Sequence, residues 1–354
     1  MSIFLSKEKP IRIGLIGCGR IAQSHVNAIL HHAPKLSLHA VCDINPVALN
    51  APFLPQTCKR YFKEQDLLND KEIDLVVLCT PSGLHPQQAI AAAKHNKHVL
   101  TEKPMATRWE EGLEMVAACE QAQVQLFVVK QNRYNPTVQK IKHVLDAGDF
   151  GRIYLVQCNV FWTRPQSYYD QSPWRGTWAL DGGALMNQAS HYVDQMQYLI
   201  GPVCAVQAMS ATLARKIEAE DTAVVNLRYQ NGALGAISVT MLTYPKNLEG
   251  SITIIGEKGT VRLGGIALNE ITHWEFQDKT VSLKDAQMAN YEIASVYGLG
   301  HVAYYHNVIE SLHGSAPAEV DGRAGLQSLE LLTAIYRAVQ QGDTVHLPLK
   351  STKE

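Results

Sequence analysis

The sequence has little net charge, no long apolar run and no paired cysteines. Its 32 lysines and arginines balance 33 aspartates and glutamates, so no basic excess points to nucleic acid or an anionic membrane surface as a partner. No stretch approaches the roughly 18 apolar residues that a membrane span needs, and the first ten residues lack the charged and apolar regions of a secretory signal. We therefore expect a cytoplasmic protein that binds neither nucleic acid nor membrane.

The seven cysteines are dispersed singly, without a Cys-x-x-Cys pair or a Cys/His cluster. This spacing favours neither a disulfide framework nor a zinc site, and we expect no bound metal. Repeats, low-complexity stretches and an obvious flexible linker are also missing, which excludes a repeat array and indicates closely joined domains.

What is present is typical of a globular protein with more than one domain. The chain has 354 residues, of which 46% are hydrophobic and 18% charged. Up to about residue 130, short runs rich in Val, Ile and Leu alternate with longer segments of helical period, a pattern that predicts βαβ units and a parallel sheet. The expected strands are 11–16, 36–42, 75–79, 98–100 and 125–129, and the expected helices are 21–31, 85–95 and 109–121.

The pattern changes after residue 132. Asn231-Gly232 lies between two alternating runs and predicts a tight hairpin, because both residues tolerate positive φ. The expected elements are helices at 136–147, 301–313 and 325–339 and strands at 153–160, 222–229, 233–240, 248–255 and 260–263. We therefore predict an α/β protein: an N-terminal Rossmann domain with a doubly wound parallel sheet in residues 1–132, then an α+β domain with an open, mostly antiparallel sheet in residues 133–354.

The segment Gly17-Cys18-Gly19-Arg20-Ile21-Ala22 has the form G-x-G-x-x-A and lies between the first strand and the first helix. Gly17 permits the tight turn, Gly19 lets the backbone approach a pyrophosphate, and the helix N-terminus that follows offers N–H groups to the phosphates. An ordinary glycine turn is the alternative, and Asp43 at the end of the next strand favours the dinucleotide. Its carboxylate can accept both ribose hydroxyls of NAD and repel the 2′-phosphate of NADP, and the alternative role of Asp43 is that of a helix cap.

Polar residues follow two further strands, in Thr80-Pro81-Ser82-Gly83-Leu84-His85 and in Thr101-Glu102-Lys103-Pro104. Ligands of open α/β sheets bind at the carboxyl ends of the strands, so Lys103 should project toward the cofactor. A partly desolvated lysine beside a positive nicotinamide ring can act as a base near neutral pH, whereas a solvated surface lysine is the alternative. The expected cofactor contacts are Gly17, Gly19, Arg20, Ile21, Asp43, Thr80, Ser82, His85, Glu102, Lys103 and Gln131.

A second polar cluster contains Asn187 and His191, whose i, i+4 spacing places both on one face of a helix. Together with Glu102-Lys103-Pro104 and the glycine fingerprint, the Gly-Gly-x3-Asn-x3-His segment resembles the glucose–fructose oxidoreductase/inositol dehydrogenase (Gfo/Idh/MocA) family over nearly the whole chain. The resemblance implies that the open sheet of the second domain shields the active site and mediates assembly, here into a homotetramer. It also implies that Lys103 and His191 are catalytic, although His191 alone would more often be a structural histidine.

Asn187 stands where an aspartate is usual in the family. An amide can orient a hydroxyl but cannot titrate, which leaves Lys103 or His191 as the base.

The aromatic segment 161–178 and residues 187–194 resemble a subgroup of the family, the bacterial UDP-N-acetyl-2-amino-2-deoxyglucuronate 3-dehydrogenases that serve lipopolysaccharide synthesis. This implies NAD-dependent oxidation of the C3 hydroxyl of a UDP-sugar acid, whose carboxylate and phosphates favour arginine contacts. The expected substrate contacts are Lys103, Arg133, Tyr134, Arg164, Tyr168, Trp174, Arg175, Asn187 and His191.

Several alternatives remain open at this point. The arginine-rich aromatic segment also suits a subunit interface. Another sugar or inositol dehydrogenase of the same family is the nearest rival function, and a non-catalytic NAD-binding regulator is a more distant one. The sequence also does not decide between free exchange of NAD and its recycling in place by a second substrate such as 2-oxoglutarate.

Overall fold

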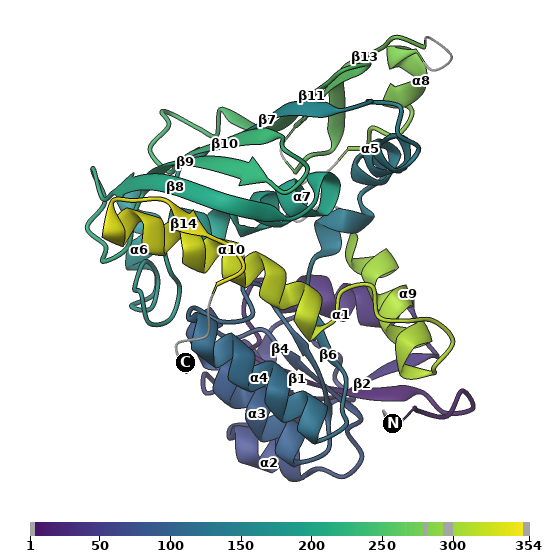
Figure 1. Ribbon diagram of the computed structural model, residues 1–354. Helices are drawn as coiled ribbons and strands as arrows, with labels where there is room; N and C mark the ends of the chain where they lie inside the picture. Colours follow the sequence, from purple (N-terminus) through teal and green to yellow (C-terminus); the bar gives the residue numbers. More distant parts are fainter. Residues whose placement is uncertain (1–3, 266, 279–281, 293–299, 350–354) are drawn as a thin grey trace. The chain divides into compact units, whose positions relative to one another are not determined.

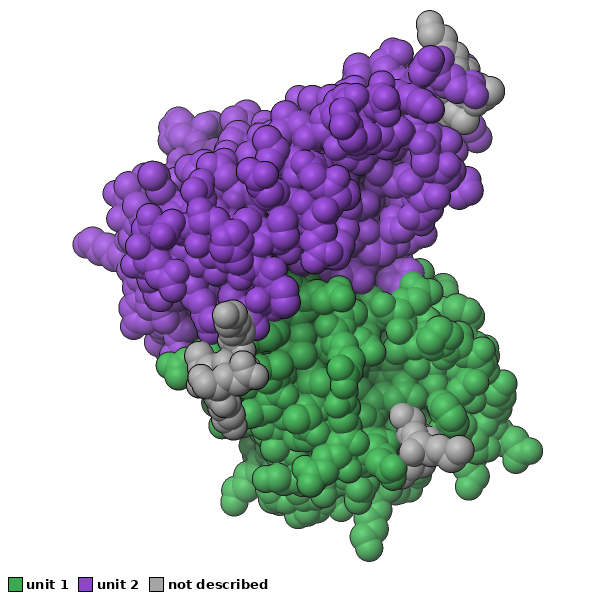
Figure 2. All heavy atoms as spheres, viewed as in Figure 1, with its two compact units in different colours: residues 1–130, 301–329 green, residues 131–300, 330–354 purple. Residues whose placement is uncertain are grey.

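The computed structural model describes residues 4–265, 267–278, 282–292 and 300–349. It divides into two compact units, one of residues 1–130 and 301–329 and the other of residues 131–300 and 330–354 (Figure 2). The division near residue 131 lies close to the expected boundary at 132, but the later segment 301–329 joins the first unit. Backbone hydrogen bonds account for this, because Val128 N–H donates to the carbonyl of Val320 at 3.2 Å and Phe127 forms a bridge with Asp321.

The first unit contains a six-stranded sheet in the order β3-β2-β1-β4-β5-β6, with all strands parallel. The chain order reverses between β1 and β4, which is the point where such sheets bind ligands. Every residue of β4 and β5 is buried, as the continuous apolar runs predicted. The strands are β1 Ile11–Ile16, β2 Leu36–Cys42, β3 Lys59–Tyr61, β4 Leu75–Leu78, β5 His98–Thr101 and β6 Leu126–Val128.

Helices of the first unit connect these strands (Figure 1). The expected strands and helices are present with small differences at their ends, whereas β3 and α2 were not predicted because each is too short to show a periodicity. The helices are α1 Ala22–His31, α2 Glu64–Asn69, α3 His85–Lys94, α4 Trp109–Gln121 and α9 Gly300–Leu312, with short 3-10 turns η1 Ala48–Asn50 and η2 Ser82–Leu84.

The second unit contains an eight-stranded sheet in the order β13-β12-β11-β7-β10-β9-β8-β14. Neighbouring strands are antiparallel except β7 and β10, so the predicted open, mostly antiparallel sheet is confirmed. The strands are β7 Ile153–Phe161, β8 Val203–Ala211, β9 Thr222–Tyr229, β10 Leu234–Thr240, β11 Glu249–Gly256, β12 Gly259–Gly264, β13 Glu270–Phe276 and β14 Val345–His346. Residues of β9 alternate between buried and accessible, as in a sheet with one covered face.

Helix α7 packs against β7 of this sheet, and α5 in turn contacts α7 (Figure 1). The helical elements that follow the first unit's sheet are η3 Gln131–Tyr134, α5 Pro136–Asp146, α6 Gln166–Asp170, the π-helical turn η4 Ala184–Gln188, α7 Ser190–Ile200, α8 Leu283–Gln287 and α10 Gly322–Gln341. In the described part of the chain, no helix combines the length and the apolar character that crossing a lipid bilayer requires.

The hairpin between β9 and β10 forms where expected but with a different turn. Gly232 has a φ of +88°, whereas Asn231 is not among the residues with positive φ. The N–H of Gly232 donates to the carbonyl of Tyr229 at 3.0 Å, and the amide of Asn231 bonds to Ile200 and to Ala233. The backbone bond from Tyr229 N–H to the carbonyl of Ala233 shows that the turn is a longer loop, residues 230–232, which ends in a left-handed glycine.

Candidate functional site

The glycine loop of the first unit has the shape that a dinucleotide needs. Gly17 has a φ of +92°, and a Cβ on it would lie 2.8 Å from the backbone of Cys79, so only glycine fits. A Cβ on Gly19 would meet no atom within 4 Å, which leaves open space beside the loop for a pyrophosphate. Arg20 is exposed, Ile21 is half-buried, and helix α1 begins at Ala22, so the N–H groups of its first turn follow this loop.

Asp43 lies directly against this loop. Its Oδ2 accepts the N–H of Cys18 at 2.8 Å, and its Oδ1 accepts the N–H of Asn45 at 2.8 Å. The second bond closes a local turn and does not cap a helix, since the next helical element, η1, has Val47 as its N-cap, and the first bond ties the carboxylate to the glycine fingerprint. Both features are compatible with ribose recognition, because each carboxylate oxygen can accept more than one hydrogen bond.

The loop that follows β4 is joined to the loop that follows β5 by His85. The ring nitrogens of His85 lie 2.9 Å from the carbonyl of Thr80 and 3.0 Å from the carbonyl of Pro104. Burial lowers the pKa of His85. The Thr80 hydroxyl bonds to Gln88, and Ser82 is buried in η2. A neutral ring has one N–H, so His85 donates to one of these carbonyls and lies against the other; it thereby contacts both strand-end loops, a role that the sequence did not predict for it.

Glu102 and Lys103 stand at the carboxyl end of β5, as expected. Glu102 is buried and its Oε2 accepts the N–H of Lys103 at 3.1 Å, while Lys103 itself is partly exposed. Burial favours the neutral acid, but the hydrogen bond from His25 and the neighbouring His301 hold the pKa of Glu102 well below its usual range. The lysine therefore follows a buried, ionised carboxylate.

In the second unit, Gln131 and His191 lie side by side, with 3.5 Å between Gln131 Nε2 and His191 Nε2. Gln131 Oε1 is buried and has no hydrogen-bond partner among the residues that the structure describes, so it is available to a bound ligand. Tyr134 lies in the same short turn, η3, and is half-buried.

Arg133 forms a bidentate ion pair with Asp194 on α7, with distances of 2.9 and 2.6 Å. Its guanidinium also stacks over the ring of Tyr198. Two of its nitrogens are thus held by a protein carboxylate, which makes Arg133 a weaker candidate for a substrate anion than Arg164 or Arg175.

The segment expected to carry Asn187 and His191 on one regular helix is interrupted. Asn187 lies in the π-helical turn η4 and His191 in the first turn of α7. The side-chain amide of Asn187 donates to Asp181, whose other oxygen accepts the N–H of Gly176 at 2.7 Å. π-Helical turns are frequent at functional sites. Asp181 was not predicted as a site residue, although it precedes the Gly-Gly pair of the motif.

Arg164 and Arg175 both stack on Tyr168. Their guanidinium carbons lie 5.4 and 4.1 Å from the centre of the Tyr168 ring, and Arg175 also stacks on Trp174 at 5.2 Å. Arg175 Nε is buried without a hydrogen-bond partner in the described ranges. Two guanidinium groups thus stack on the ring of Tyr168, and that of Arg175 has an N–H without a partner. Such a pair suits an anionic ligand, because a guanidinium can bind a phosphate and can stack on a planar base.

Glu220 and Tyr336 hold the start of η4. The carboxylate of Glu220 accepts the N–H of Leu185 at 2.8 Å and the hydroxyl of Tyr336 at 3.0 Å, and Tyr336 in turn accepts the N–H of Met186. Burial raises the pKa of Glu220 to about 7. These residues have no local motif that sequence reasoning could have detected, because they are distant in the chain from the turn they cap.

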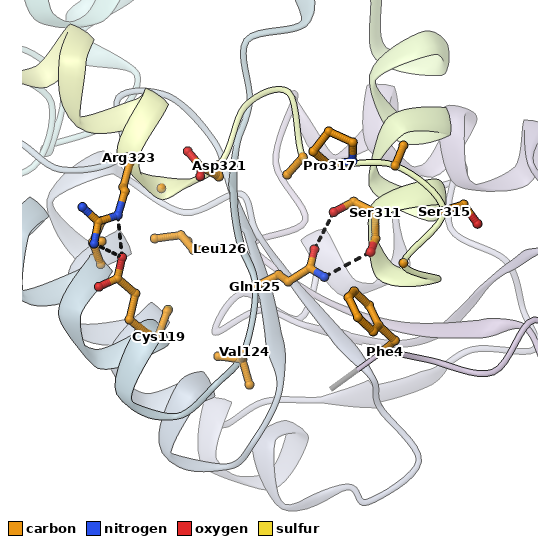
Figure 3. Close-up of a pocket in the computed structure, with 16 residues that line it drawn as sticks. Phe4, Cys119, Val124, Gln125, Leu126, Ser311, Ser315, Pro317, Asp321 and Arg323 are labelled. Atoms are coloured by element: carbon orange, nitrogen blue, oxygen red, sulfur yellow. Dashed lines mark hydrogen bonds and ion pairs between the residues drawn. The ribbon is translucent and has the colours of Figure 1, made fainter. Parts of the chain in front are cut away.

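The first unit also has a hollow of about 520 Å³, between α4, β6 and the segment after α9 (Figure 3). An ion pair between Arg323 and Glu120 and a hydrogen-bonded pair of Gln125 and Ser311 lie along its walls. No candidate cofactor or substrate residue lines it. We therefore do not count this hollow as part of the candidate site.

Comparisons with known proteins match both units. Residues 11–130 match a family model described as the NAD-binding Rossmann fold of the Gfo/Idh/MocA oxidoreductases, and residues 142–347 match the C-terminal alpha/beta domain of the same family. A curated relative of similar length, the scyllo-inositol 2-dehydrogenase (NADP(+)) IolW of Bacillus subtilis, is 26% identical over 96% of this chain and 97% of its own.

Two solved structures are much more similar. The WlbA dehydrogenase from Bordetella pertussis, in complex with NADH and UDP-GlcNAcA, is 55% identical, covers 98% of this chain and 100% of its own, and superposes with a TM-score of 0.94. The WlbA dehydrogenase from Chromobacterium violaceum, also with NADH and UDP-GlcNAcA, is 53% identical over 99% of both chains with a TM-score of 0.92.

Proposed function

The chain belongs to the Gfo/Idh/MocA oxidoreductase family, and from that membership we propose that it oxidises the C3 hydroxyl of UDP-GlcNAcA to a 3-keto sugar with NAD as oxidant. The observation that carries this proposal is the likeness, at 55% identity over nearly the full length, to a dehydrogenase solved with NADH and UDP-GlcNAcA. A role in building diacetamido uronic acids for lipopolysaccharide is part of the same proposal.

The residues of the first unit fit an NAD molecule. Gly17 and Gly19 leave room for its pyrophosphate, and Asp43 offers a carboxylate toward its ribose. When bound, NAD supplies the acceptor for the hydride that leaves C3. We assign the proton of the C3 hydroxyl to Lys103 or His191, and Asn187 orients that hydroxyl without titrating. The C3 carbon thus loses one hydride and its oxygen loses one proton, which leaves a ketone.

Arg164 and Arg175 are our candidates for the anionic groups of the substrate. Arg175 has a buried Nε without a partner among the described residues, and both guanidinium groups are held in place by stacking on Tyr168. Arg133 is already bound to Asp194, so we assign it a structural contribution to the turn that carries Gln131. The sugar carboxylate and the diphosphate therefore have two pre-oriented guanidinium groups.

The test is incubation of the purified protein with NAD and UDP-GlcNAcA. We expect NADH to form together with a nucleotide sugar that is lighter by two hydrogen atoms, and we expect Lys103→Ala to lower turnover by orders of magnitude while retaining NAD binding. A parallel panel contains UDP-GlcNAc, which lacks the carboxylate, and free myo-inositol.

Preferential turnover of inositol would favour a different dehydrogenase of the same family. Tight NAD binding without turnover of any panel member would favour a regulator. A further arm adds 2-oxoglutarate to enzyme that was purified with bound NADH. Loss of the NADH signal there, with formation of 2-hydroxyglutarate, would show recycling of the cofactor in place.

We also propose a homotetramer that covers the open face of the second unit's sheet. On this face Met209 of β8 and Val224 of β9 are paired, and their relative exposures are 80% and 52%. A second row runs through Leu234, Leu155 and Ile255 on three neighbouring strands, all of them exposed. The row that contains Asn226 and Gln157 lies between these two rows, so the interface we propose combines apolar and polar contacts.

Light scattering on the purified protein tests the assembly. We expect the mass of four chains for the natural sequence and a smaller species for Leu155→Glu. A monomer at all concentrations would contradict the proposal.

A further inference from the structure

Three buried side chains of the first unit form a hydrogen-bonded chain that ends beside Lys103. The hydroxyl of Tyr305 on α9 lies 2.8 Å from His25 Nδ1, and His25 Nε2 on α1 lies 2.9 Å from Glu102 Oε1. The relative exposures of His25 and Tyr305 are both 0% and that of Glu102 is 6%. The proposed oxidation assigns no proton or hydride transfer to these three residues. Their buried hydrogen bonds therefore need a separate explanation.

The direction of each hydrogen bond follows from the chemistry of the groups. An ionised carboxylate only accepts, so His25 must donate its Nε2–H to Glu102. A neutral imidazole then has a lone pair on Nδ1, which accepts the hydroxyl proton of Tyr305. Burial lowers the pKa of His25 and raises that of the Tyr305 hydroxyl well above its usual range, so both remain uncharged near neutral pH. Tyr305 thereby selects the Nε2–H tautomer of His25.

Glu102 connects this chain to the lysine. Its Oε1 is taken by His25, its Oε2 accepts the backbone N–H of Lys103 at 3.1 Å, and its own N–H donates to the carbonyl of Leu78 on β4 at 3.0 Å. Rotation of the carboxylate would break both side-chain bonds at once. The orientation of Glu102, and with it the turn that carries Lys103, therefore depends on a donor at His25 Nε2.

We propose that Tyr305 and His25 are positioning residues for the oxidation, which act through Glu102 to hold Lys103 in its working orientation. This inference rests on the proposed function, because it assigns Lys103 a part in catalysis. The proposal also gives a role to α9, which belongs to the first unit although it follows the second unit's sheet in the chain. This helix supplies the hydroxyl that fixes the tautomer of His25. A comparable device is a carboxylate that fixes the tautomer of a catalytic histidine in serine proteases.

A metal ion is the competing explanation for the same residues. One atom each from His25, Glu102 and His301 lie within 4.8 Å of one another, and His301 Nε2 is buried. The hydrogen-bonded chain accounts for both nitrogens of His25 without an ion. Metal analysis of the purified protein separates the two explanations, because one zinc or iron per chain would overturn the proton assignment made here.

The first test is spectroscopic and needs no substrate. In protein labelled with 15N-histidine at pH 8, we expect His25 to show the neutral Nε2–H tautomer, and we expect Tyr305→Phe to produce a mixture of tautomers. Tyr304→Phe is the matched control, since Tyr304 is the neighbouring buried tyrosine of α9 and its hydroxyl lies outside this chain of bonds. A neutral Nδ1–H tautomer or a charged His25 in the natural protein would refute the inference.

The second test measures turnover of UDP-GlcNAcA. We expect Tyr305→Phe to lower kcat by about tenfold, the usual size for loss of an outer partner, with little change in KM and with folding and NAD binding retained. We expect Tyr304→Phe to leave kcat unchanged.

An unchanged kcat in Tyr305→Phe, or equal losses in both variants, would show that Tyr305 only fills space. A natural protein that does not oxidise UDP-GlcNAcA would contradict the proposed function, whereas the tautomer measurement would still decide the arrangement of the chain. His25→Gln provides a second variant, because its amide can donate to Glu102 but has no tautomer for Tyr305 to select.

Discussion

The buried carboxylate of Glu220 should make the stability of the second unit depend on pH. Its relative exposure is 2%, and one of its oxygens, Oε2, has no hydrogen-bond partner in the described part of the chain. Burial raises the pKa of Glu220 from 4.5 to about 7, against the opposing effect of hydrogen bonds from Leu185 and Tyr336. The folded protein therefore holds this proton over a pH range in which the unfolded chain has lost it.

The sign of the effect follows from proton linkage. Below pH 4.5 the carboxyl is protonated in both states and contributes no penalty. As the pH rises from 4.5 to 7, the folded state binds more protons than the unfolded state, so stability falls, and above pH 7 the loss remains constant. At 1.36 kcal/mol for each pKa unit, the loss attributable to Glu220 is about 3 kcal/mol.

Glu220→Gln isolates this contribution, because the amide keeps the size of the side chain and cannot ionise. We expect the natural protein to lose about 3 kcal/mol relative to the variant between pH 4.5 and pH 8, equivalent to roughly 6–12 °C in the unfolding midpoint of a domain of 150–250 residues. Thermal unfolding of both proteins across this range measures the difference.

Glu275→Gln is the control, because it removes one negative charge from an exposed position on β13. The difference between this control and the natural protein should not vary with pH by more than a small fraction of that amount. Parallel pH dependence for the natural protein and Glu220→Gln would refute the reasoning, since it would mean that Glu220 titrates alike in the folded and unfolded states.

Three further predictions concern the candidate site. Asp43→Ala should bring the KM values for NAD and NADP close together, because it removes the carboxylate beside the glycine loop; initial rates with both cofactors test this, and an unchanged preference would contradict it. Arg175→Lys should raise the KM for UDP-GlcNAcA by about 10–100-fold with a smaller effect on kcat, since lysine cannot make a bidentate contact, and unchanged kinetics would remove Arg175 from the site. Asp181→Asn should also raise this KM, by about tenfold, because it weakens the bonds to Gly176 and Asn187, and a loss of NAD affinity instead would count against a role in the substrate half.

Local patterns in the sequence were sufficient for most of the fold. The strands of the first sheet have continuous apolar runs because helices cover both of their faces, so β1, β2, β4 and β5 were predicted within about a residue at each end. Strand β8 was not predicted, since every residue after Val206 is at least partly exposed and only Met209 among them is a large apolar residue. Patterns of this kind also could not show that residues 301–329 return to the first unit, because a helix with an apolar face can pack against either sheet.

Only part of the candidate site could likewise be predicted from the sequence. Residues at strand ends or in short motifs, such as Gly17, Asp43 and Lys103, could be singled out because the Rossmann fold fixes where the carboxyl ends of strands lie. Their partners could not. His25 bonds to Tyr305 across 280 positions of the sequence, and Arg133 pairs with Asp194 across 61. Such pairs form only through tertiary packing, so a local stretch of sequence cannot reveal them.

The hydrogen bond between Asn187 and Asp181 suggests a reason for the asparagine at position 187. The family's usual aspartate could titrate beside the substrate, whereas here the carboxylate is that of Asp181, which accepts a hydrogen bond from the side-chain amide of Asn187. Both oxygens of Asp181 already accept fixed donors, from Gly176 and Asn187, and the residue is buried. A carboxylate held in this way sets geometry and is poorly suited to take a proton from substrate. We therefore propose that the asparagine separates orientation, by Asp181 and Asn187, from proton transfer, by Lys103 or His191.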